Sequence, residues 1–509
     1  MALPPVSLHP VDGAVSLELL RGHLDALVER ADVPVAFGPE VLEAADRAAA
    51  SWREDGIERV DRTDVEFVTL DPASSTDLDQ AMHLERGGDG RGGYTVLYAI
   101  ADVPAFVALD GPIDAEARRR GQTVYLPDRR ISLHPEALSE GAASLLPDQE
   151  APAFVWRFTL DAQGVVTSTA LERAVVRSRA QLAYDAVQSD LDAGRAHPMM
   201  TLLMEIGDRR RALEAERGGA SLNLPEQEVI ADGGSIRLQW RAPLPIEDAN
   251  AQLSLMTGMA AAQVMIDGGA GILRTMPPAD DASVRRLRAA ARALGQPWGD
   301  DVPYGTFLRT LDPSVPRHLA LLNQAASLFR GAGYLAFTGP EELPADETDR
   351  AQAAIGAPYA HTTAPLRRLV DRFVLLTCHH LLAGTALPAG LRAALPLIPE
   401  AMKETSGRAG TLEREALDLV EVLALAPLVG RELTGTVLET REATEDRPAT
   451  SLLQFDEPPV SRLAEISGEV GAVVHVRLDG VDIDARTTRF SATGAPAAGR
   501  TADETADAS

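Results

Sequence analysis

Three aspartates lie close together in the stretch DPASSTDLDQ, which covers residues 71–80. Asp71, Asp77 and Asp79 follow the letters VEFVTL, whose β-branched and apolar residues predict a strand. Carboxylate oxygens are ligands that Mg²⁺ prefers, and two such ions can activate a water for phosphodiester hydrolysis. Asp and Ser are also turn residues, because their side chains bond to nearby backbone groups. Spacing alone therefore leaves a metal-binding loop and a capped turn both open.

A pair of arginines is the second feature whose residue types could take part in chemistry. It lies in PYAHTTAPLRRLVDRF, residues 358–373, where Pro365 suits the first turn of a helix and precedes Arg367 and Arg368. Guanidinium groups held there could bind a phosphate through paired hydrogen bonds. Adjacent arginines are also common on solvated helix faces and in ion pairs, so this stretch does not decide the chemistry alone.

The elements that must position these residues predict an α+β multidomain protein. Two helical patterns in residues 1–60 indicate a small helical N-terminal domain, either a helix-turn-helix or a helical hairpin packed on the main body. Residues 61–428 begin with strand patterns and continue with long helical ones, which predicts a mixed α/β catalytic domain. Residues 429–492 return to short strands and predict a small β-barrel. The tail, 493–509, has no apolar residue larger than alanine apart from one proline and should be disordered.

The predicted elements can be given by their letters. The expected strands are VEFVTL, YTVLYAIADV, FVWRFTLDAQGVVTSTALERAVV, ELTGTVLET, ATSLLQF and GAVVHVRLDGVDIDART, and the expected helices of the middle region include AQLAYDAVQSDLDAG, MMTLLMEIGDRRRALEAER, EDANAQLSLMTGMAAAQVMI and APLRRLVDRFVLLTCHHLLAG.

Composition restricts the class of protein. The 509 residues are too many for a single core. A net charge of −27 argues against a generally basic nucleic-acid-binding surface, although it leaves room for a local basic channel. Cys378 is the only cysteine, which fits a reducing cytosol. The first residues lack the pattern of a signal peptide, and no apolar run of about 18 residues predicts a membrane span. We therefore expect a cytoplasmic, monomeric protein with no membrane partner.

Four motifs together resemble the ribonuclease II (RNB) family of exoribonucleases over residues 61–490. They are DPASSTDLDQA, SLLP, SRAQLAYDAV and PYAHTTAPLRRLVDRF, and they occur in the family's order and spacing. The C-terminal barrel resembles the S1 domain, an OB-fold that binds RNA in this family. The resemblance implies hydrolysis of RNA from the 3′ end, with Mg²⁺ or Mn²⁺ as cofactor and release of 5′-nucleoside monophosphates.

The resemblance also implies roles for single residues. Asp71 and Asp77 match metal-site aspartates, and Asp79 matches the aspartate most critical to the chemistry. Arg367 matches the arginine that contacts the phosphate and stabilises developing charge. RNA-binding roles are expected for Tyr184, at the 3′-terminal nucleotide, and for Arg367, Arg368 and Glu413.

The chain departs from the family at three places. Gln80 stands where the family has the last aspartate of its cluster; a carboxamide oxygen can still bind a metal but brings no charge. We therefore expect weaker metal binding, and we expect Gln80→Asp to raise activity or lower the magnesium requirement. The helix NAQLSLMTGMAAAQ lacks the family's paired glutamates and later asparagine. Only about sixty helical residues precede Asp71, where the family has two cold-shock barrels, so we expect a wider mouth to the RNA channel.

Two other functions stay open. The missing charge at Gln80 favours a catalytically weak RNA-binding or regulatory protein on the same fold, whereas Asp79 and Arg367 favour an enzyme. A hydrolase acting on another phosphodiester, such as DNA, is the third interpretation. The histidines lack the separated pairs of zinc modules, and we expect them in packing or RNA-facing positions: His83, His134, His361, His379 and His380.

Overall fold

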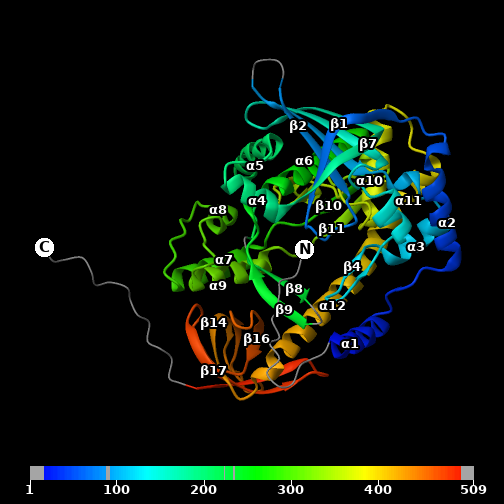
Figure 1. Cartoon of the computed structure of the whole chain (residues 1–509). Coiled ribbons are helices and arrows are strands. Elements are labelled where there is room, and N and C mark those ends of the chain that lie inside the picture. Colours follow the sequence, from blue (N-terminus) through cyan, green and yellow to red (C-terminus); the bar gives the residue numbers. More distant parts are fainter. Residues whose placement is uncertain (1–16, 88–91, 223, 233–234, 494–509) are drawn as a thin grey trace.

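The structure is a computed structural model that describes residues 17–87, 92–222, 224–232 and 235–493. Its fold is mixed α+β, as the sequence predicted. Figure 1 shows strands β1, β2 and β7 at one end of the molecule and strands β14, β16 and β17 at the other, with the long helix α12 (Ile398–Leu425) reaching from the main body to the second group.

Five strands of the main body close into a barrel in the order β1-β2-β3-β6-β7. β1 and β7 pair in parallel, and the other neighbours that share a register are antiparallel. Both faces of β3 are buried, because alternate side chains point to opposite sides: Tyr98 joins a cluster formed with the helices, and Ala99 joins a second cluster with Phe67. The strands are β1 (Val60–Asp71), β2 (Gln80–Arg86), β3 (Tyr94–Ala101), β6 (Glu150–Leu160) and β7 (Val166–Ala183).

Helices pack against this barrel and build the rest of the main body. α6 (Pro245–Gly268) contacts both α5 (Pro198–Glu216) and α10 (Leu369–Leu382), and residues of all three join the largest hydrophobic cluster. The other helices of this region are α3 (Pro112–Arg120), α4 (Tyr184–Asp192), α7 (Asp281–Ala293), α8 (Tyr304–Leu308), α9 (Pro316–Ala325) and α11 (Ala389–Ala394), and the short strand pairs are β4 (Val124–Tyr125) with β5 (Arg130–Ile131), β10 (Gly271–Thr275) with β11 (Gly333–Phe337), and β12 (Ala351–Gln352) with β13 (Ala357–Pro358).

Two predicted helix starts are wrong. Residues 180–183 are strand rather than helix, because β7 keeps pairing with β1 until Ala183 lies opposite Asp71. Pro365 does not begin a helix: α10 starts at Leu369, and the residues just before it form a turn.

The last five strands form one sheet in the order β16-β15-β14-β17-β18. A hairpin that the sequence analysis missed, β8 (Glu226–Asp232) with β9 (Ser235–Arg241), extends to this sheet: the Trp240 Nε1–H donates to the Phe455 carbonyl at 3.0 Å. The strands are β14 (Glu432–Arg441), β15 (Thr450–Phe455), β16 (Ser461–Ala464), β17 (Val473–Asp482) and β18 (Thr487–Ala492).

The two N-terminal helices pack in different places. α1 (Leu17–Arg30) joins the hydrophobic cluster of α12 and the C-terminal sheet, whereas α2 (Pro39–Ser51) joins a cluster around α3. The predicted N-terminal helical domain is therefore not confirmed, because the described helices share no core of their own. The predicted disordered tail lies, from residue 494 on, outside the described residues. In the described part of the chain, no helix combines the length and apolar character needed to cross a membrane.

Candidate active site

The acidic loop between β1 and β2 is held by two side chains from distant segments. The Ser144 hydroxyl donates to the Thr76 carbonyl at 2.8 Å and accepts the Leu78 N–H at 2.9 Å. The Gln181 amide donates to the Ser75 carbonyl at 2.8 Å. Ser144 is the first residue of SLLP, so this motif fixes the backbone that carries the aspartates.

Asp79 and Arg367 lie in contact although 288 positions separate them. The Leu366 backbone N–H donates to Asp79 Oδ1 at 2.8 Å, and Arg367 Nε donates to Asp79 Oδ2 at 3.2 Å. Asp79 is 3% exposed, whereas the Arg367 side chain is 41% exposed. Among the described residues, no hydrogen bond engages the two terminal nitrogens of Arg367, which leaves them available to an anionic group.

Backbone pairing delivers the arginine turn to the acidic loop. The Thr123 N–H donates to the Arg367 carbonyl at 3.0 Å, and the Leu369 N–H donates to the Gly121 carbonyl at 2.9 Å. This ladder also places β4, which begins at Val124, beside the turn. The pairing of residues 121–123 with residues 367–369, which lies outside the regular sheets, therefore brings β4 next to the arginine turn.

Burial raises the pKa of two of the carboxylates above the ordinary value, because it removes water that would stabilise their negative charge. It raises the pKa of Asp79 to about 8, against the lowering effects of Arg367 and of the Leu366 N–H. It raises the pKa of Asp71 to about 6, where Arg367 lowers and Asp77 raises the value. A carboxylate with a raised pKa gains more from a nearby cation than an exposed one does.

Asp77 already has a cation from the chain itself. Arg130 Nη1 donates to Asp77 Oδ1 at 2.8 Å, and the Tyr125 hydroxyl donates to Asp77 Oδ2 at 3.4 Å. Tyr125 is 36% exposed, so its ring is open to a ligand next to the acidic loop. The sequence analysis missed both Tyr125 and Arg130, because the letters VYLPDRR carry no sign of the loop that they contact.

The Gln80 side chain makes two internal hydrogen bonds. Its amide nitrogen donates to the Thr363 carbonyl at 2.6 Å, and its amide oxygen accepts from the Tyr98 hydroxyl at 2.6 Å. Both ends of the side chain are thus engaged in internal hydrogen bonds that join β2, β3 and the segment before the arginine turn. The metal contact predicted for Gln80 stays a prediction beside these bonds.

Arg368 is engaged in an ion pair. Its Nε and Nη2 donate to the two oxygens of Asp371 at 3.0 and 2.8 Å, and Asp371, which is fully buried, also accepts the Ala364 N–H at 2.7 Å. This pair holds the turn that presents Arg367. The described contacts therefore give Arg368 a structural role, and its predicted RNA contact has no support among them.

Tyr184 and Glu413 both lie near the acidic loop. The pairing of Ala183 with Asp71 puts Tyr184 at the end of β1, where its hydroxyl accepts from the Asn250 amide at 2.9 Å. Burial raises the pKa of Tyr184 to about 12. Glu413 Oε1 accepts the Tyr125 N–H at 3.2 Å. The structure thus places both residues at the site, and Asn250 is a further polar contact that the sequence analysis missed.

The chemistry of the donors fits a hard divalent cation. Within the described residues, His, Cys, Asp and Glu side chains do not form a group of three or more already arranged around a metal position. Asp79 nevertheless carries a buried carboxylate and Asp71 a partly buried one, and Asp77 lies close enough to raise the pKa of both. Oxygen donors of this kind suit Mg²⁺ or Mn²⁺, and Arg130 occupies one oxygen of the set.

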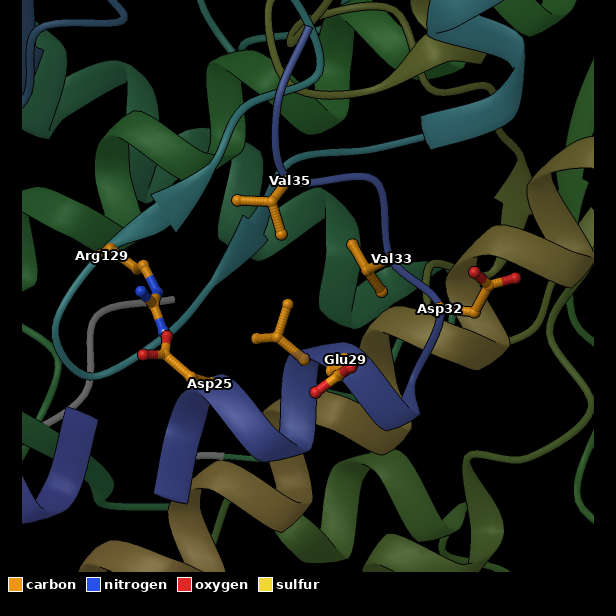
Figure 2. A pocket seen from close by; sticks show the side chains of 7 residues that line it. Asp25, Glu29, Asp32, Val33, Val35 and Arg129 are labelled. Carbon is orange, nitrogen blue, oxygen red and sulfur yellow. The ribbon is translucent and has the colours of Figure 1, made fainter. Parts of the chain in front are cut away.

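A separate pocket of about 320 Å³ lies beside α1. Figure 2 shows that Arg129 and Asp25 point toward one another there, with Val33 and Val35 nearby. Its lining contains none of the predicted site residues, so we do not assign the chemistry to it. The residues that line it are Asp25, Val28, Glu29, Asp32, Val33, Val35 and Arg129.

Comparison with known proteins gives consistent matches. Residues 59–384 match the RNB domain family. The chain is 29% identical over 369 residues to Exoribonuclease 2 of Edwardsiella piscicida, a match that covers 69% of this chain and 54% of that protein. It is 25% identical over 491 residues to Ribonuclease R of Escherichia coli, covering 88% of this chain and 59% of that protein. The chain thus spans little more than half the length of these two relatives.

Solved structures share the fold. The apo form of Mycoplasma genitalium RNase R aligns with a TM-score of 0.81 at 20% identity, covering 93% of this chain and 78% of that one. Yeast Ssd1, described as a pseudonuclease, aligns with a TM-score of 0.66 at 15% identity, covering 87% of this chain and 55% of that one.

Proposed function

The chain belongs to the RNB domain family, and from this premise we propose that it is a 3′-to-5′ exoribonuclease that depends on a divalent metal and releases 5′-nucleoside monophosphates. The observation that carries the proposal is the contact between Asp79 and Arg367. It joins a buried carboxylate to a guanidinium whose terminal nitrogens make no hydrogen bond within the described part of the chain and could bind a phosphate.

Asp71, Asp77 and Asp79 would hold the cation, and we favour Mg²⁺, with Mn²⁺ as a substitute. A bound divalent ion supplies positive charge and lowers the pKa of a coordinated water. Arg367 binds a non-bridging oxygen of the scissile phosphate and stabilises the negative charge that grows there. The pair between Arg368 and Asp371 keeps that guanidinium in place.

Aromatic side chains hold the 3′ end of the RNA in this proposal. Tyr125 is exposed beside Asp77, and every base offers a face for stacking on such a ring. Tyr184 follows Ala183, which pairs with Asp71 at the end of β1. Glu413 fixes the backbone of Tyr125 through its hydrogen bond.

We assign residues 61–428 to the catalytic domain and 429–492 to an S1-type, OB-fold RNA-binding domain. A cavity of about 1000 Å³ lies between α7, α9 and the C-terminal sheet. Arg286, Arg330 and Arg441 are among its lining residues, and arginines along such a path suit contacts with a phosphate backbone. This cavity supports a route for the upstream RNA.

A wider mouth of the RNA channel stays a prediction, as does a cytoplasmic location. A duplex with a 3′ overhang tests the first: degradation that continues close to the stem supports a wide mouth, and stalling at a long fixed distance from every stem counts against it.

A catalytically weak RNA-binding protein is the second candidate. Two observations favour it: Gln80 is engaged internally, and Arg130 neutralises Asp77. A shared fold does not decide between the two candidates, because similar folds host active and inactive proteins. The terminal nitrogens of Arg367, which make no hydrogen bond among the described residues, and the buried carboxylate of Asp79 favour the enzyme.

One assay separates the candidates. RNA labelled at the 3′ end and RNA labelled at the 5′ end are incubated with the protein and Mg²⁺ or Mn²⁺, beside the Asp79→Asn variant. The exoribonuclease releases labelled mononucleotide early from the 3′ label only, and the variant does not. RNA binding without degradation in either metal would support the catalytically weak RNA-binding protein. Degradation of single-stranded DNA at the same rate as RNA would mean that the substrate is not specifically RNA.

A further inference from the structure

Arg130 lies between two carboxylates at the edge of the acidic loop. It begins β5 and pairs with Tyr125 of β4. Its Nη1 donates to Asp77 Oδ1 at 2.8 Å, and its Nη2 contacts both Glu140 Oε1 and the Thr76 hydroxyl. The side chains of Arg130 and Glu140 are about a quarter exposed, at 26% and 25%.

Glu140 belongs to the same network from the opposite side. It lies in the short helical segment η3 (Ala137–Ala142), and its Oε2 accepts from the Thr76 hydroxyl at 2.7 Å. Arg130 therefore has a second anionic partner, Glu140, which is not one of the three aspartates of the acidic loop. Because Arg130 already contacts Glu140, its guanidinium can release Asp77 without being left unpaired.

A guanidinium and a divalent cation compete when they need the same carboxylate oxygen. Arginine stays charged at every accessible pH, so its positive charge cannot be removed by proton loss. The attraction that holds it on Asp77 must be given up when a metal binds there, and like charges that remain close repel each other. Its partial exposure allows the side chain to move.

We propose that Arg130 is a resident competitor of the metal: it occupies an oxygen of Asp77, sets a low metal affinity, and gives up Asp77 while keeping its contact with Glu140 when a cation binds. The proposal rests on the proposed function, since it concerns the same acidic site. It also offers, in place of Gln80, a physical cause for the raised metal requirement that we expect from the sequence.

The test measures Mn²⁺ binding to the RNA-free protein by electron paramagnetic resonance, which counts free Mn²⁺ and needs no catalysis. Arg130→Gln removes the competitor and is expected to bind Mn²⁺ about tenfold more tightly or better. Arg130→Lys keeps a positive charge at Asp77 and is expected to stay near the wild-type affinity. Arg129→Gln is the matched control, because it removes the same charge from the next residue, whose partners are Asp25 and Asp128.

Glu140 provides a variant of opposite sign. Glu140→Gln removes the alternative partner of Arg130, so the guanidinium stays on Asp77 and Mn²⁺ binding weakens. The double variant separates this effect from a general loss of negative charge. In the Arg130→Gln background, Glu140→Gln should change the affinity much less than it does in the wild type.

The outcomes distinguish the two proposals. If the wild type binds Mn²⁺ and Arg130→Gln binds it with the same affinity, Arg130 is not a competitor of the metal, and the proposed function is unaffected. An equal gain in Arg129→Gln also overturns it, because net charge would then be the cause. If neither the wild type nor Arg130→Gln binds Mn²⁺ more tightly than Asp79→Asn does, the metal site itself fails and both proposals fall. Thermal unfolding of each variant shows whether it is folded. If Arg130→Gln does not fold, Glu140→Gln still tests the competition between Arg130 and the metal.

Discussion

Gln80→Asp is the substitution for which sequence and structure predict opposite results. The sequence predicts a gain, because the variant restores a carboxylate to the acidic loop. In the structure, however, the Gln80 amide bridges the Tyr98 hydroxyl and the Thr363 carbonyl, each at 2.6 Å. An aspartate is one methylene shorter and has no N–H, so it loses the bond to Thr363 and draws back from Tyr98.

The expected cost follows from burial. Tyr98 is fully buried and Thr363 is 2% exposed, so neither group finds water easily when its partner is lost. A buried polar group without a partner costs about 1–3 kcal/mol. We therefore expect Gln80→Asp to lower the free energy of unfolding by about 2–4 kcal/mol in total, and to lower activity through the Thr363 segment rather than raise it.

Thermal unfolding and Mn²⁺ titration of the metal-free protein test this expectation together. Gln80→Asp should unfold several °C below the wild type and gain no metal affinity. Gln80→Glu keeps the length and an acceptor for Tyr98 but cannot donate to Thr363, so we expect an intermediate loss. Tyr98→Phe is the control for the hydroxyl, and in its background Gln80→Asp should cost less than in the wild type.

A particular pair of results would refute this reasoning. If Gln80→Asp unfolds at the wild-type temperature and binds Mn²⁺ at least tenfold more tightly, residue 80 faces the metal. The internal bridge would then be the wrong description of that side chain, and the original expectation of a missing charge would be right.

Four further predictions concern the same site. First, Mn²⁺ binding should tighten as pH rises, because the ion displaces protons from the carboxylates: about two per ion below the pKa of about 6 at Asp71, about one between there and the pKa of about 8 at Asp79, and few above it. A series of affinity measurements across pH tests this. Because both pKa values are raised in the fold, the stability that protonation gives the metal-free protein should be lost as pH rises toward 8. Second, Arg367→Lys should lower kcat/KM about 10²–10³-fold, because it removes the fork that binds the phosphate, and unchanged single-turnover kinetics would contradict this role. Third, Tyr125→Ala should weaken RNA binding by about 1–3 kcal/mol while Tyr125→Phe keeps most of it, as a fluorescence-anisotropy titration would show; equal losses in both would mean that the hydroxyl matters and the ring does not. Fourth, Asp371→Asn should lower the free energy of unfolding by about 3–5 kcal/mol, because it breaks a buried bidentate pair, and a melting curve like that of the wild type would argue against that structural role.

The sequence by itself determined most of the elements and the chemical types at the site. Strands such as those containing VEFVTL and YTVLYAIADV were predictable because alternation and β-branched residues act locally. The three aspartates and Arg367 stood out by residue type, but their expected roles came from the resemblance of four motifs to the RNB family and not from spacing alone. Helix starts failed at Ala180 and Pro365, because pairing with other segments overrode the local preference.

Only the tertiary structure decided which side chains meet. The bond between Asp79 and Arg367 spans 288 positions, and it depends on the backbone ladder beside Gly121. The same packing bonded Gln80 to the Thr363 carbonyl and brought Arg130 onto Asp77. The physical reason is that hydrophobic periodicity specifies each element alone, whereas the partner of a buried polar group is whichever distant segment the closed barrel and its helices place within hydrogen-bond reach.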